Sequence, residues 1–358
     1  MFSFRRKTTQ LVGIDISSTS IKLIELSQSA DAPAELYRVE AFAVEPLPPS
    51  AVVEKKIADI DAVGQGIQRA VVRSGTRAKR AAVAVSGSAM VLTKVIAMAA
   101  SLSDAEMEMQ IQLEADQYIP YPLEEVNIDF DVLGPTANNA EMVDVLLAAS
   151  RRENVDDRVA ALEIGGLGAA IVDVDTYAME SACTLLLGRV DDERHDQTVA
   201  VVDVGAAATT LHVLRDGKIV YTREQNFGGH LLLEEIQRRY SISRPDALDS
   251  LHAGSLPENF ETDVLGPFKE ALAQQITRAL QFFYSASSFR RTDQVILTGG
   301  AAGIAQIEEL VEERLGFPVS IANPFAPMGM APGIDVQSIE RAAPQMMIAT
   351  GLALRAFD

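Results

Sequence analysis

The sequence contains little cysteine and little histidine, and this scarcity argues against two kinds of site. The only cysteine among 358 residues is Cys183, which lies in an apolar, helix-like stretch. We therefore expect a buried structural thiol, no intramolecular disulfide and a reducing compartment such as the cytosol. The histidines have no spacing typical of zinc ligands (His195, His212, His230 and His252). A Ser-Gly-Ser run at 86–88 has no recognisable His and Asp partners, so a catalytic triad is not indicated.

Positive charge and long apolar runs are also scarce. The chain has 31 Lys and Arg residues against 50 Asp and Glu residues, a formal net charge of −19. No basic stripe is large enough to offset this repulsion, so we expect protein partners rather than nucleic acid or anionic lipid. A membrane-spanning helix needs about 20 apolar residues. Asp173, Asp175 and Glu180 interrupt the best candidates, so no direct membrane span is expected.

The first seven residues carry two aromatic side chains and three cations. They lack the long apolar segment and the small-residue cleavage site of a signal peptide. We expect a mobile leader that stays on the protein. Contact of this leader with an anionic leaflet is a less favoured hypothesis. One short basic cluster supplies little attraction to such a surface.

An acidic turn occurs twice in the sequence. Residues 13–20 (GIDISSTS) and residues 202–210 (VDVGAAATT) each follow a strand-like run, and each places an Asp beside small or hydroxyl-bearing residues. Such turns expose backbone N–H groups and hydroxyls suited to phosphate oxygens, while the carboxylate can hold a hydrated Mg²⁺. Taken alone, either segment is better explained as an ordinary hairpin turn.

Two glycine pairs strengthen the nucleotide interpretation. Residues 295–302 (VILTGGAA) form an apolar strand that ends in paired glycines before a helical pattern at 304–315, and residues 227–230 (FGGH) precede another helix. Glycine lets a backbone pass close to a flat base or a ribose, because no Cβ intervenes. In this order, the four segments resemble the phosphate 1, phosphate 2 and adenosine elements of the actin and Hsp70 ATPase superfamily, together with its further glycine pair.

Three stretches narrow the resemblance. These are residues 11–23 (LVGIDISSTSIKL), 44–49 (VEPLPP) and 297–303 (LTGGAAG). Together they resemble PilM, the FtsA-like family of type IV pilus assembly proteins, over nearly the whole chain.

The resemblance implies an α/β, actin-like fold. This is a duplicated, ribonuclease H-like pair of domains with a small inserted FtsA-like 1C subdomain. The implied boundaries are 1–86 and 154–192 for the first domain, 87–153 for the inserted subdomain, 197–325 for the second domain, and 334–358 for a C-terminal helix that returns to the first domain.

The hydrophobic periodicity predicts the individual elements. Each half opens with three strand-like segments, at 11–15, 21–26 and 35–44 and again at 199–204, 209–214 and 218–222. Helices are predicted at 56–72, 103–115 and 343–357, among others. Ser103 suits the start of the second of these, because its hydroxyl can accept from early N–H groups. Four apolar residues of that helix are expected to pack in a core (Met107, Met109, Ile111 and Leu113).

The superfamily pattern assigns hypothetical roles to individual residues. Asp15 and Asp203 would hold Mg²⁺ through water. Further donors to the phosphates of ATP would be Ser17, Ser18, Thr19, Gly205, Ala206, Ala207 and Thr209. Lys22 would either supplement this charge or face solvent. Ribose and adenine would meet Gly228, Gly229, Gly299, Gly300 and Arg278, although a solvated helix face explains Arg278 as well.

Hydrolysis is expected to be slow or negligible. The second phosphate turn of the superfamily commonly carries a glycine pair, whereas Gly205 is followed here by three alanines, which resist positive φ. No residue is identified as orienting the attacking water. Three nearby carboxylates are expected to be helix-terminal or surface groups (Glu153, Asp156 and Asp175).

The resemblance also implies partners. The N-terminal cytoplasmic segment of the inner-membrane protein PilN would dock in a groove between the first domain and the inserted subdomain. PilO and PilP would be linked through PilN, and pilus motor ATPases are further possible neighbours. The final helix is not followed by the linker and amphipathic helix of FtsA, which favours a cytoplasmic protein held at the inner membrane by its partners. An actin-like ATPase or sugar kinase, and an FtsA-like polymer, are the alternative functions.

Overall fold

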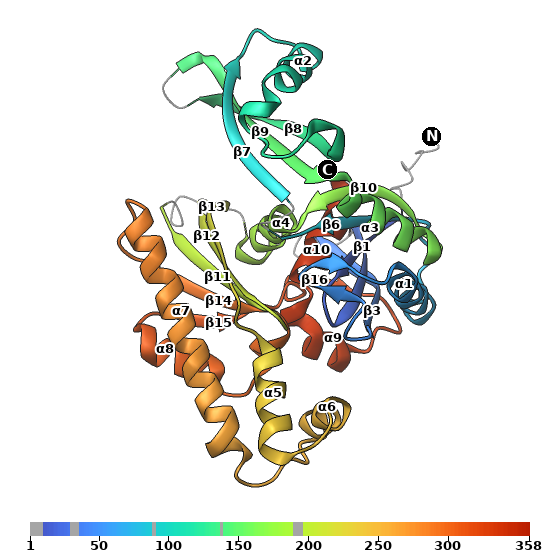
Figure 1. The fold of residues 1–358 in the computed structure, drawn as a ribbon, viewed down its shortest axis with the longest axis vertical. Helices are drawn as coiled ribbons and strands as arrows, with labels where there is room; N and C mark the ends of the chain where they lie inside the picture. Colours follow the sequence, from blue (N-terminus) through green and yellow to red (C-terminus); the bar gives the residue numbers. More distant parts are fainter. Residues whose placement is uncertain (1–9, 29–35, 88–90, 137–138, 189–195) are drawn as a thin grey trace, which may run out of the picture.

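The computed structural model describes residues 10–28, 36–87, 91–136, 139–188 and 196–358. The predicted leader at 1–7 and most of the acidic linker at 188–197 lie outside the described residues. The described chain forms two large mixed sheets that lie side by side and a smaller sheet that projects from one of them (Figure 1).

The first large sheet has the strand order β10-β6-β1-β2-β3-β16. An antiparallel meander comes first in the chain, and two parallel strands then extend the sheet on the β1 side. The strands are β1 (Leu11–Ile16), β2 (Ser20–Gln28), β3 (Tyr37–Pro46), β6 (Arg80–Val85), β10 (Gly168–Val174) and β16 (Met328–Met330). Alternate residues of β1 face opposite sides of the sheet. Val12 and Ile14 pack toward α1 (Ile60–Ser74) and α3 (Arg152–Ile164). Leu11 packs on the other side, toward α4 (Asp175–Leu187) and α10 (Met347–Leu354).

The second large sheet has the order β13-β12-β11-β14-β15, which is the order of the first sheet read from its other end, without an equivalent of β16. Its meander is β11 (Thr198–Val204), β12 (Thr209–Arg215) and β13 (Lys218–Gln225), and the parallel strands are β14 (Gln294–Thr298) and β15 (Val319–Ile321). Packed around it are α5 (Gly229–Tyr240), α6 (Arg244–Ala253), α7 (Gly266–Ala286) and α8 (Ile307–Leu315). The matching strand orders confirm the duplicated fold predicted from the sequence.

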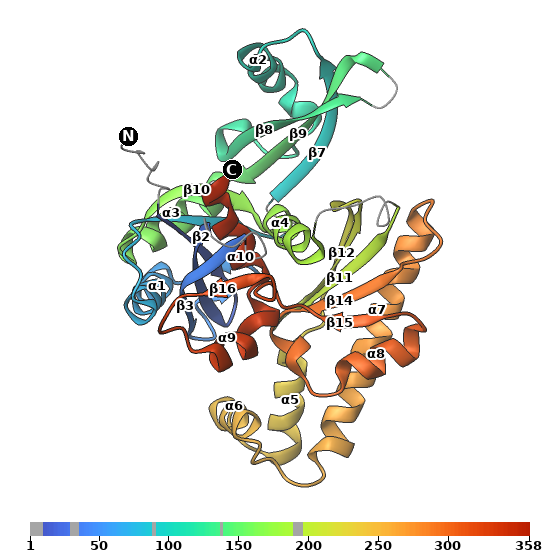
Figure 2. The same cartoon turned by 180° about the vertical axis from the view of Figure 1, so that it is seen from behind.

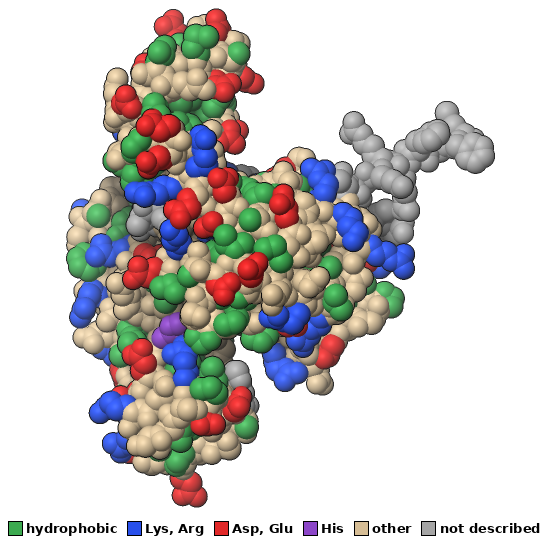
Figure 3. Space-filling model, turned by 45° about the vertical axis from the view of Figure 1, so that its right-hand side comes forward, with side chains coloured by type: hydrophobic (Ala, Val, Ile, Leu, Met, Phe, Trp, Pro, Cys, Tyr) green, Lys and Arg blue, Asp and Glu red, His purple; other side chains and the backbone are tan. Residues whose placement is uncertain are grey.

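The projecting part is built from β7 (Val91–Ala99), β8 (Val126–Thr136), β9 (Asn139–Arg151) and α2 (Asp104–Glu114), with the sheet order β7-β9-β8. Ser103 starts α2 as predicted, because its backbone N–H and the Glu106 side chain join at 2.8 Å in a capping box. Figure 3 shows acidic side chains over the tip of this part.

The packing predicted for α2 is only half right. Met107 and Ile111 are buried in the small core, whereas Met109 is 64% exposed and Leu113 is 79% exposed. The physical reason is the helical period. Residues four apart share a face, but residues two apart lie on nearly opposite faces, so one core cannot take all four side chains.

Two other predicted helices have different bounds. Helix α1 begins at Ile60 rather than Lys56, because the Asp59 side chain caps it, and β5 (Lys56–Ile57) instead forms a hairpin with β4 (Val52–Val53). The predicted helix at 343–357 is divided into short 3-10 turns around α10, and the separate helix α9 (Val336–Ala342) precedes it. Pro344 follows α9 and interrupts the helical hydrogen bonding.

Helices α4 and α10 lie between the two large sheets (Figure 2). Met179, Cys183 and Met347 pack there against strands of the second sheet. Cys183 is buried, as expected, and its burial raises the pKa of the thiol to about 12. The helices approach closely at Gly351, where a Cβ would lie 1.7 Å from the carbonyl oxygen of Ala178.

Candidate functional site

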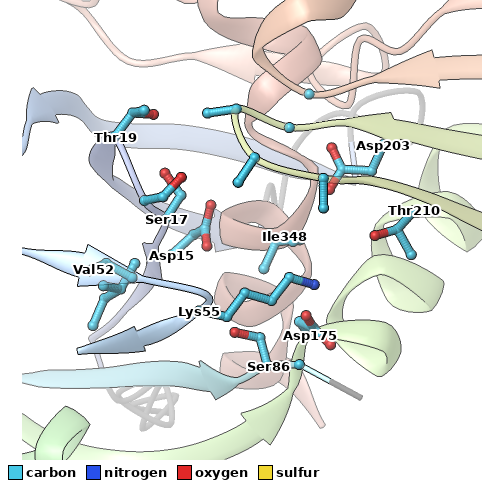
Figure 4. Close-up of a pocket in the computed structure, with 18 of the residues that line it drawn as sticks. Asp15, Ser17, Thr19, Val52, Lys55, Ser86, Asp175, Asp203, Thr210 and Ile348 are labelled. Carbon is cyan, nitrogen blue, oxygen red and sulfur yellow. The ribbon is translucent and has the colours of Figure 1, made fainter. Parts of the chain in front are cut away.

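A cavity of about 1450 Å³ lies between the two halves and is lined by the carboxyl ends of strands from both large sheets. In the first half, Asp15 lies at the end of β1, Ser86 follows β6, and Asp175 follows β10. These three strands are parallel neighbours, so their carboxyl ends meet at one edge and the three side chains face the same space (Figure 4).

The second half contributes a row of polar residues that crosses four strands. Thr298 of β14 pairs with Asp203, Asp203 pairs with Thr210 of β12, and Thr210 pairs with Glu224 of β13. All four line the cavity. Partners in register share one face of a sheet, so the row forms a continuous polar wall.

The first acidic turn is closed by its own hydroxyl groups. Ser17 Oγ donates to the carbonyl oxygen of Ser20 at 3.0 Å and accepts from the Ser20 N–H at 3.3 Å. Lys22 pairs across the strands with Asp15 at 2.8 Å and is only 5% exposed, which excludes the solvent-facing alternative. The predicted residues that line the cavity from this turn are Asp15, Ser17, Ser18, Thr19 and Lys22.

The second acidic turn is tight and is braced by α5. The Gly205 N–H donates to the Ala208 carbonyl at 2.9 Å, and none of the alanines has a positive φ. The Gly229 and His230 N–H groups donate to the carbonyls of Gly205 and Ala206. The alanines that replace the usual glycines therefore cause no backbone strain. Gly205, Ala206, Ala207 and Gly229 line the cavity as predicted.

Three predicted site residues lie outside the cavity lining. Thr209 is buried and donates to the Phe227 carbonyl at 2.7 Å, so its hydroxyl holds the turn. Gly228 packs on the turn, where a Cβ would lie 2.5 Å from the Ala206 oxygen. Arg278 is on the exposed face of α7. Their predicted contacts with phosphate, ribose and adenine find no support in this geometry.

The second glycine pair lies beside Asp203. Gly299 has φ of +92°, and a Cβ there would lie 2.4 Å from Asp203 Oδ1, so only glycine fits. Gly300 has open space around its Cα. Nearby, His230 lines the cavity and its Nε2 is buried without a partner among the described residues.

Several cavity residues were not predicted as functional, and Asp175 and Lys55 are two charged ones among them. Asp175 begins α4, as a helix-terminal carboxylate would, but the surface interpretation is wrong because it lies in the cavity. Its position after an apolar strand repeats the pattern of Asp15 and Asp203, which is a signal that could have identified it. Lys55, at the tip of the β4–β5 hairpin, reaches into the cavity and forms an ion pair with Glu224. Glu153 also lines the cavity, but its side chain is 62% exposed and pairs with Lys56, as expected of a surface group.

The charges in the cavity are coupled. Burial raises the pKa of Asp203 to about 6; Asp15 and Asp175 add to this shift, while Lys22 and Lys55 oppose it. Burial likewise raises the pKa of Asp175. Burial favours the neutral form of Lys55, but the neighbouring carboxylates outweigh it and raise the pKa of its ammonium group.

The cavity therefore holds more negative than positive charge. Its carboxylates come from Asp15, Glu54, Glu153, Asp157, Asp175, Asp203 and Glu224, and its ammonium groups come from Lys22, Lys55 and Lys56. A polyphosphate would be repelled unless a cation entered with it. Within the described part of the chain, no group of three or more His, Cys, Asp or Glu side chains could hold a metal ion. Such a cation would need water or phosphate oxygens among its ligands.

Comparison with known proteins identifies the family. The family described as "Type IV pilus assembly protein PilM" matches residues 13–357. The chain belongs to this family. FtsA of Rhizobium meliloti (strain 1021) is 28% identical over 171 residues, which cover 40% of this chain and 38% of that protein. FtsA of Enterococcus hirae is 24% identical over 362 residues, which cover 89% of this chain and 79% of that protein.

Solved structures agree with this PilM family assignment. A structure described as the PilM-PilN type IV pilus biogenesis complex has a TM-score of 0.78 and 26% identity, and the match covers 98% of this chain and 99% of that chain. The ethanolamine utilization protein EutJ from Carboxydothermus hydrogenoformans, with a TM-score of 0.57 and 16% identity, shares the fold. Among the described residues, no helix has the length and apolar character needed to cross a membrane.

Proposed function

We propose that this PilM family protein is an ATP-binding scaffold of type IV pilus assembly. One observation carries the proposal: equivalent acidic turns from the two duplicated sheets place Asp15 and Asp203 in a single cavity. A ligand with a phosphate chain would contact both turns at once. Bound nucleotide would thereby fix the relative position of the two halves and of any protein-binding surface that depends on it.

The residues present fit a hydrated Mg²⁺. Asp15 and Asp203 are close enough for their charges to couple, and the cavity has excess negative charge for a cation to balance. Mg²⁺ usually keeps several waters and binds one or two carboxylates together with phosphate oxygens. When bound, it would neutralise phosphate charge. Lys22, held against Asp15, would add a second positive group on the same side.

The glycine pair beside Asp203 would form the base and ribose end of the site. Gly300 leaves open space in which a flat group could approach the backbone, while Gly299 lets this turn pack directly against Asp203 and Val204. His230 offers a buried ring nitrogen that has no partner among the described residues, which a polar edge of a base would satisfy. The phosphate chain would then run from the glycine pair between the two turns.

The proposed partner is the N-terminal cytoplasmic segment of PilN, docked between the first domain and the inserted subdomain. The related structure with 26% identity is of a PilM-PilN complex, which supports this partner. Through PilN the protein would connect to PilO and PilP and, on the other side, to the pilus motor ATPases. It would then be cytoplasmic and held at the inner membrane by these contacts.

Co-purification would test partner and ligand together. We expect the wild-type protein to retain a synthetic PilN N-terminal peptide and to carry ATP or ADP, measured by chromatography of the denatured sample. Asp203→Ala is expected to lose most of the nucleotide and to bind the peptide more weakly. The exposed carboxylate of Asp156 provides the control Asp156→Ala, which should behave as wild type. A wild-type protein that binds neither nucleotide nor peptide would contradict the proposal.

A second candidate function is enzymatic ATP hydrolysis at the rate of an ordinary actin-like ATPase. The buried Asp175 faces the cavity from the first half, where a carboxylate could orient an attacking water. Steady-state phosphate release separates the two functions. Turnover comparable to ordinary ATPases, lost in Asp175→Asn, would favour an enzyme, whereas slow release unaffected by this change would favour the scaffold.

A further inference from the structure

Lys55 lies at one end of the polar row that crosses the second sheet. The row runs from Thr298 through Asp203 and Thr210 to Glu224, and the ammonium group of Lys55 pairs with Glu224. Adjacent strands are about 4.8 Å apart, so the row spans roughly 14 Å. The glycine pair Gly299 and Gly300 follows Thr298 at the opposite end. A ligand lying along the row would meet the glycines first and Lys55 last.

The backbone that carries Lys55 is held in an unusual conformation. Glu54 and Lys55 both have positive φ, 50° and 66°, which residues other than glycine rarely adopt. The fully buried Arg158 fixes this tip by donating to the Lys55 carbonyl at 3.1 Å and to the Ala84 carbonyl at 2.6 Å. Strain that the surroundings maintain in this way is typical of functional positions. Here it directs the ammonium group into the cavity, as Figure 4 shows.

Lys55 is also the cavity cation whose partner comes from across the cleft. Lys22 pairs with Asp15 of the same hairpin, and Lys56 pairs with Glu153 at the exposed edge. Lys55 instead joins the first half to Glu224 on the edge strand β13 of the second half. A terminal phosphate group is a stronger acceptor for an ammonium group than one carboxylate, because it offers more charge and more oxygens.

We propose that Lys55 binds the terminal phosphate of a nucleoside triphosphate, releasing Glu224, and so makes the site prefer a triphosphate to a diphosphate. This inference rests on the proposed nucleotide-binding function. A diphosphate that occupies the same base site ends nearer the acidic turns and leaves the Lys55–Glu224 pair in place. Lys55 would then exchange Glu224 for phosphate only when the third phosphate is present.

The test compares the affinities of the full chain for MgATP and MgADP by titration calorimetry. We expect Lys55→Gln to weaken MgATP binding at least tenfold while changing MgADP binding by less than about threefold, as for the loss of one charge-assisted hydrogen bond. Lys55→Arg, which keeps the charge, should recover part of the difference. Glu224→Gln removes the competing carboxylate and is expected to tighten MgATP binding several-fold without affecting MgADP.

Lys218→Gln is the matched control. Lys218 also links β13 to the first half, through Glu180 at 3.0 Å, but it is 77% exposed and lies outside the cavity lining. This variant should leave both affinities unchanged. If Lys55 were only a clasp between the halves, Lys55→Gln and Glu224→Gln would change binding in the same direction and would affect both nucleotides equally. That result would overturn the inference.

The outcomes also separate this inference from the proposed function. A wild-type protein that binds neither nucleotide contradicts the nucleotide site itself. A wild-type protein that binds both, with a ratio of affinities that Lys55→Gln leaves unchanged, contradicts only the role of Lys55. Thermal unfolding of each variant without ligand would verify that the variants are folded.

Discussion

At the scale of single residues, Asp203 is a carboxylate whose burial opposes folding. Its pKa rises from an ordinary 3.8 to about 6, so between these values the folded state keeps a proton that the unfolded chain releases. The cost of ionising it is absent near pH 4 and complete above pH 6, where it amounts to about 3 kcal/mol. A cation that entered the site would stabilise the ionised carboxylate and so reduce this cost.

Asp203→Asn should therefore stabilise the ligand-free protein, and only at the higher pH. We expect a gain of up to about 3 kcal/mol at pH 7 that fades toward zero near pH 4, measured by urea unfolding at both values. Asp156→Asn, on the exposed face of α3, is the control and should show no such gain. An equal gain from Asp203→Asn at both pH values would show that burial of its charge is not the cause.

The sequence revealed some site residues and concealed others for physical reasons. Asp15 and Asp203 stand in acidic turns after apolar strands, Lys22 stands in the strand after the first turn, and the structure places all three in the cavity. Lys55 gave no signal, because its role depends on a two-residue hairpin turn that usually requires Asn or Gly. Its Glu-Lys sequence has no turn signature and stands directly before the predicted helix at 56–72, so no role was assigned to it.

At the scale of elements, the packing of α10 on α4 depends on the absence of a side chain. Gly351 lets the two helices approach until a Cβ would lie 1.7 Å from the Ala178 oxygen. Gly13 of β1 also packs closely against α10, where a Cβ would lie 2.1 Å from the Ala349 oxygen. The backbone atoms on the other side cannot rotate away, as a flexible side chain could.

We expect Gly351→Ala to destabilise the protein by about 3 kcal/mol or more, at the upper end of overpacking effects. The measurement is urea or thermal unfolding of the purified variant. Gly303→Ala provides the control, because a Cβ at Gly303 has no neighbour within 4 Å and its φ is not positive. Similar midpoints for the two variants would mean that the α4–α10 contact relaxes easily.

Elements with a clear local pattern were predictable, and those that depend on distant partners were not. The strands of the meanders at 11–46 and 198–225 have alternating or continuous apolar residues, and they were predicted with small errors at their ends. The short strand β16 was missed, because three residues become a strand only by pairing with β3. The hairpin β4–β5 was missed for the same reason.

At the scale of the whole molecule, the inserted subdomain is attached next to the cavity. Ser86 lies just after β6, and Val91 and Thr93 lie at the start of β7; all three line the cavity. Strand β9 returns directly into α3, which carries the buried Arg158 that fixes the Lys55 hairpin. One connection to the projecting subdomain therefore lines the cavity, and the other leads into the helix that holds a cavity-lining hairpin.

This arrangement predicts reciprocal coupling between nucleotide and PilN peptide. Under the proposed function, saturating MgATP should change the affinity for the peptide by at least about fivefold, and saturating peptide must change the affinity for MgATP by the same factor. Both factors can be measured by fluorescence anisotropy of a labelled peptide and by calorimetry of the nucleotide. Asp203→Ala should reduce the first factor to one, because the nucleotide no longer binds. Peptide binding that is independent of MgATP, with both ligands bound, would show that the cavity and the peptide groove act separately and that the nucleotide does not set the scaffold's shape.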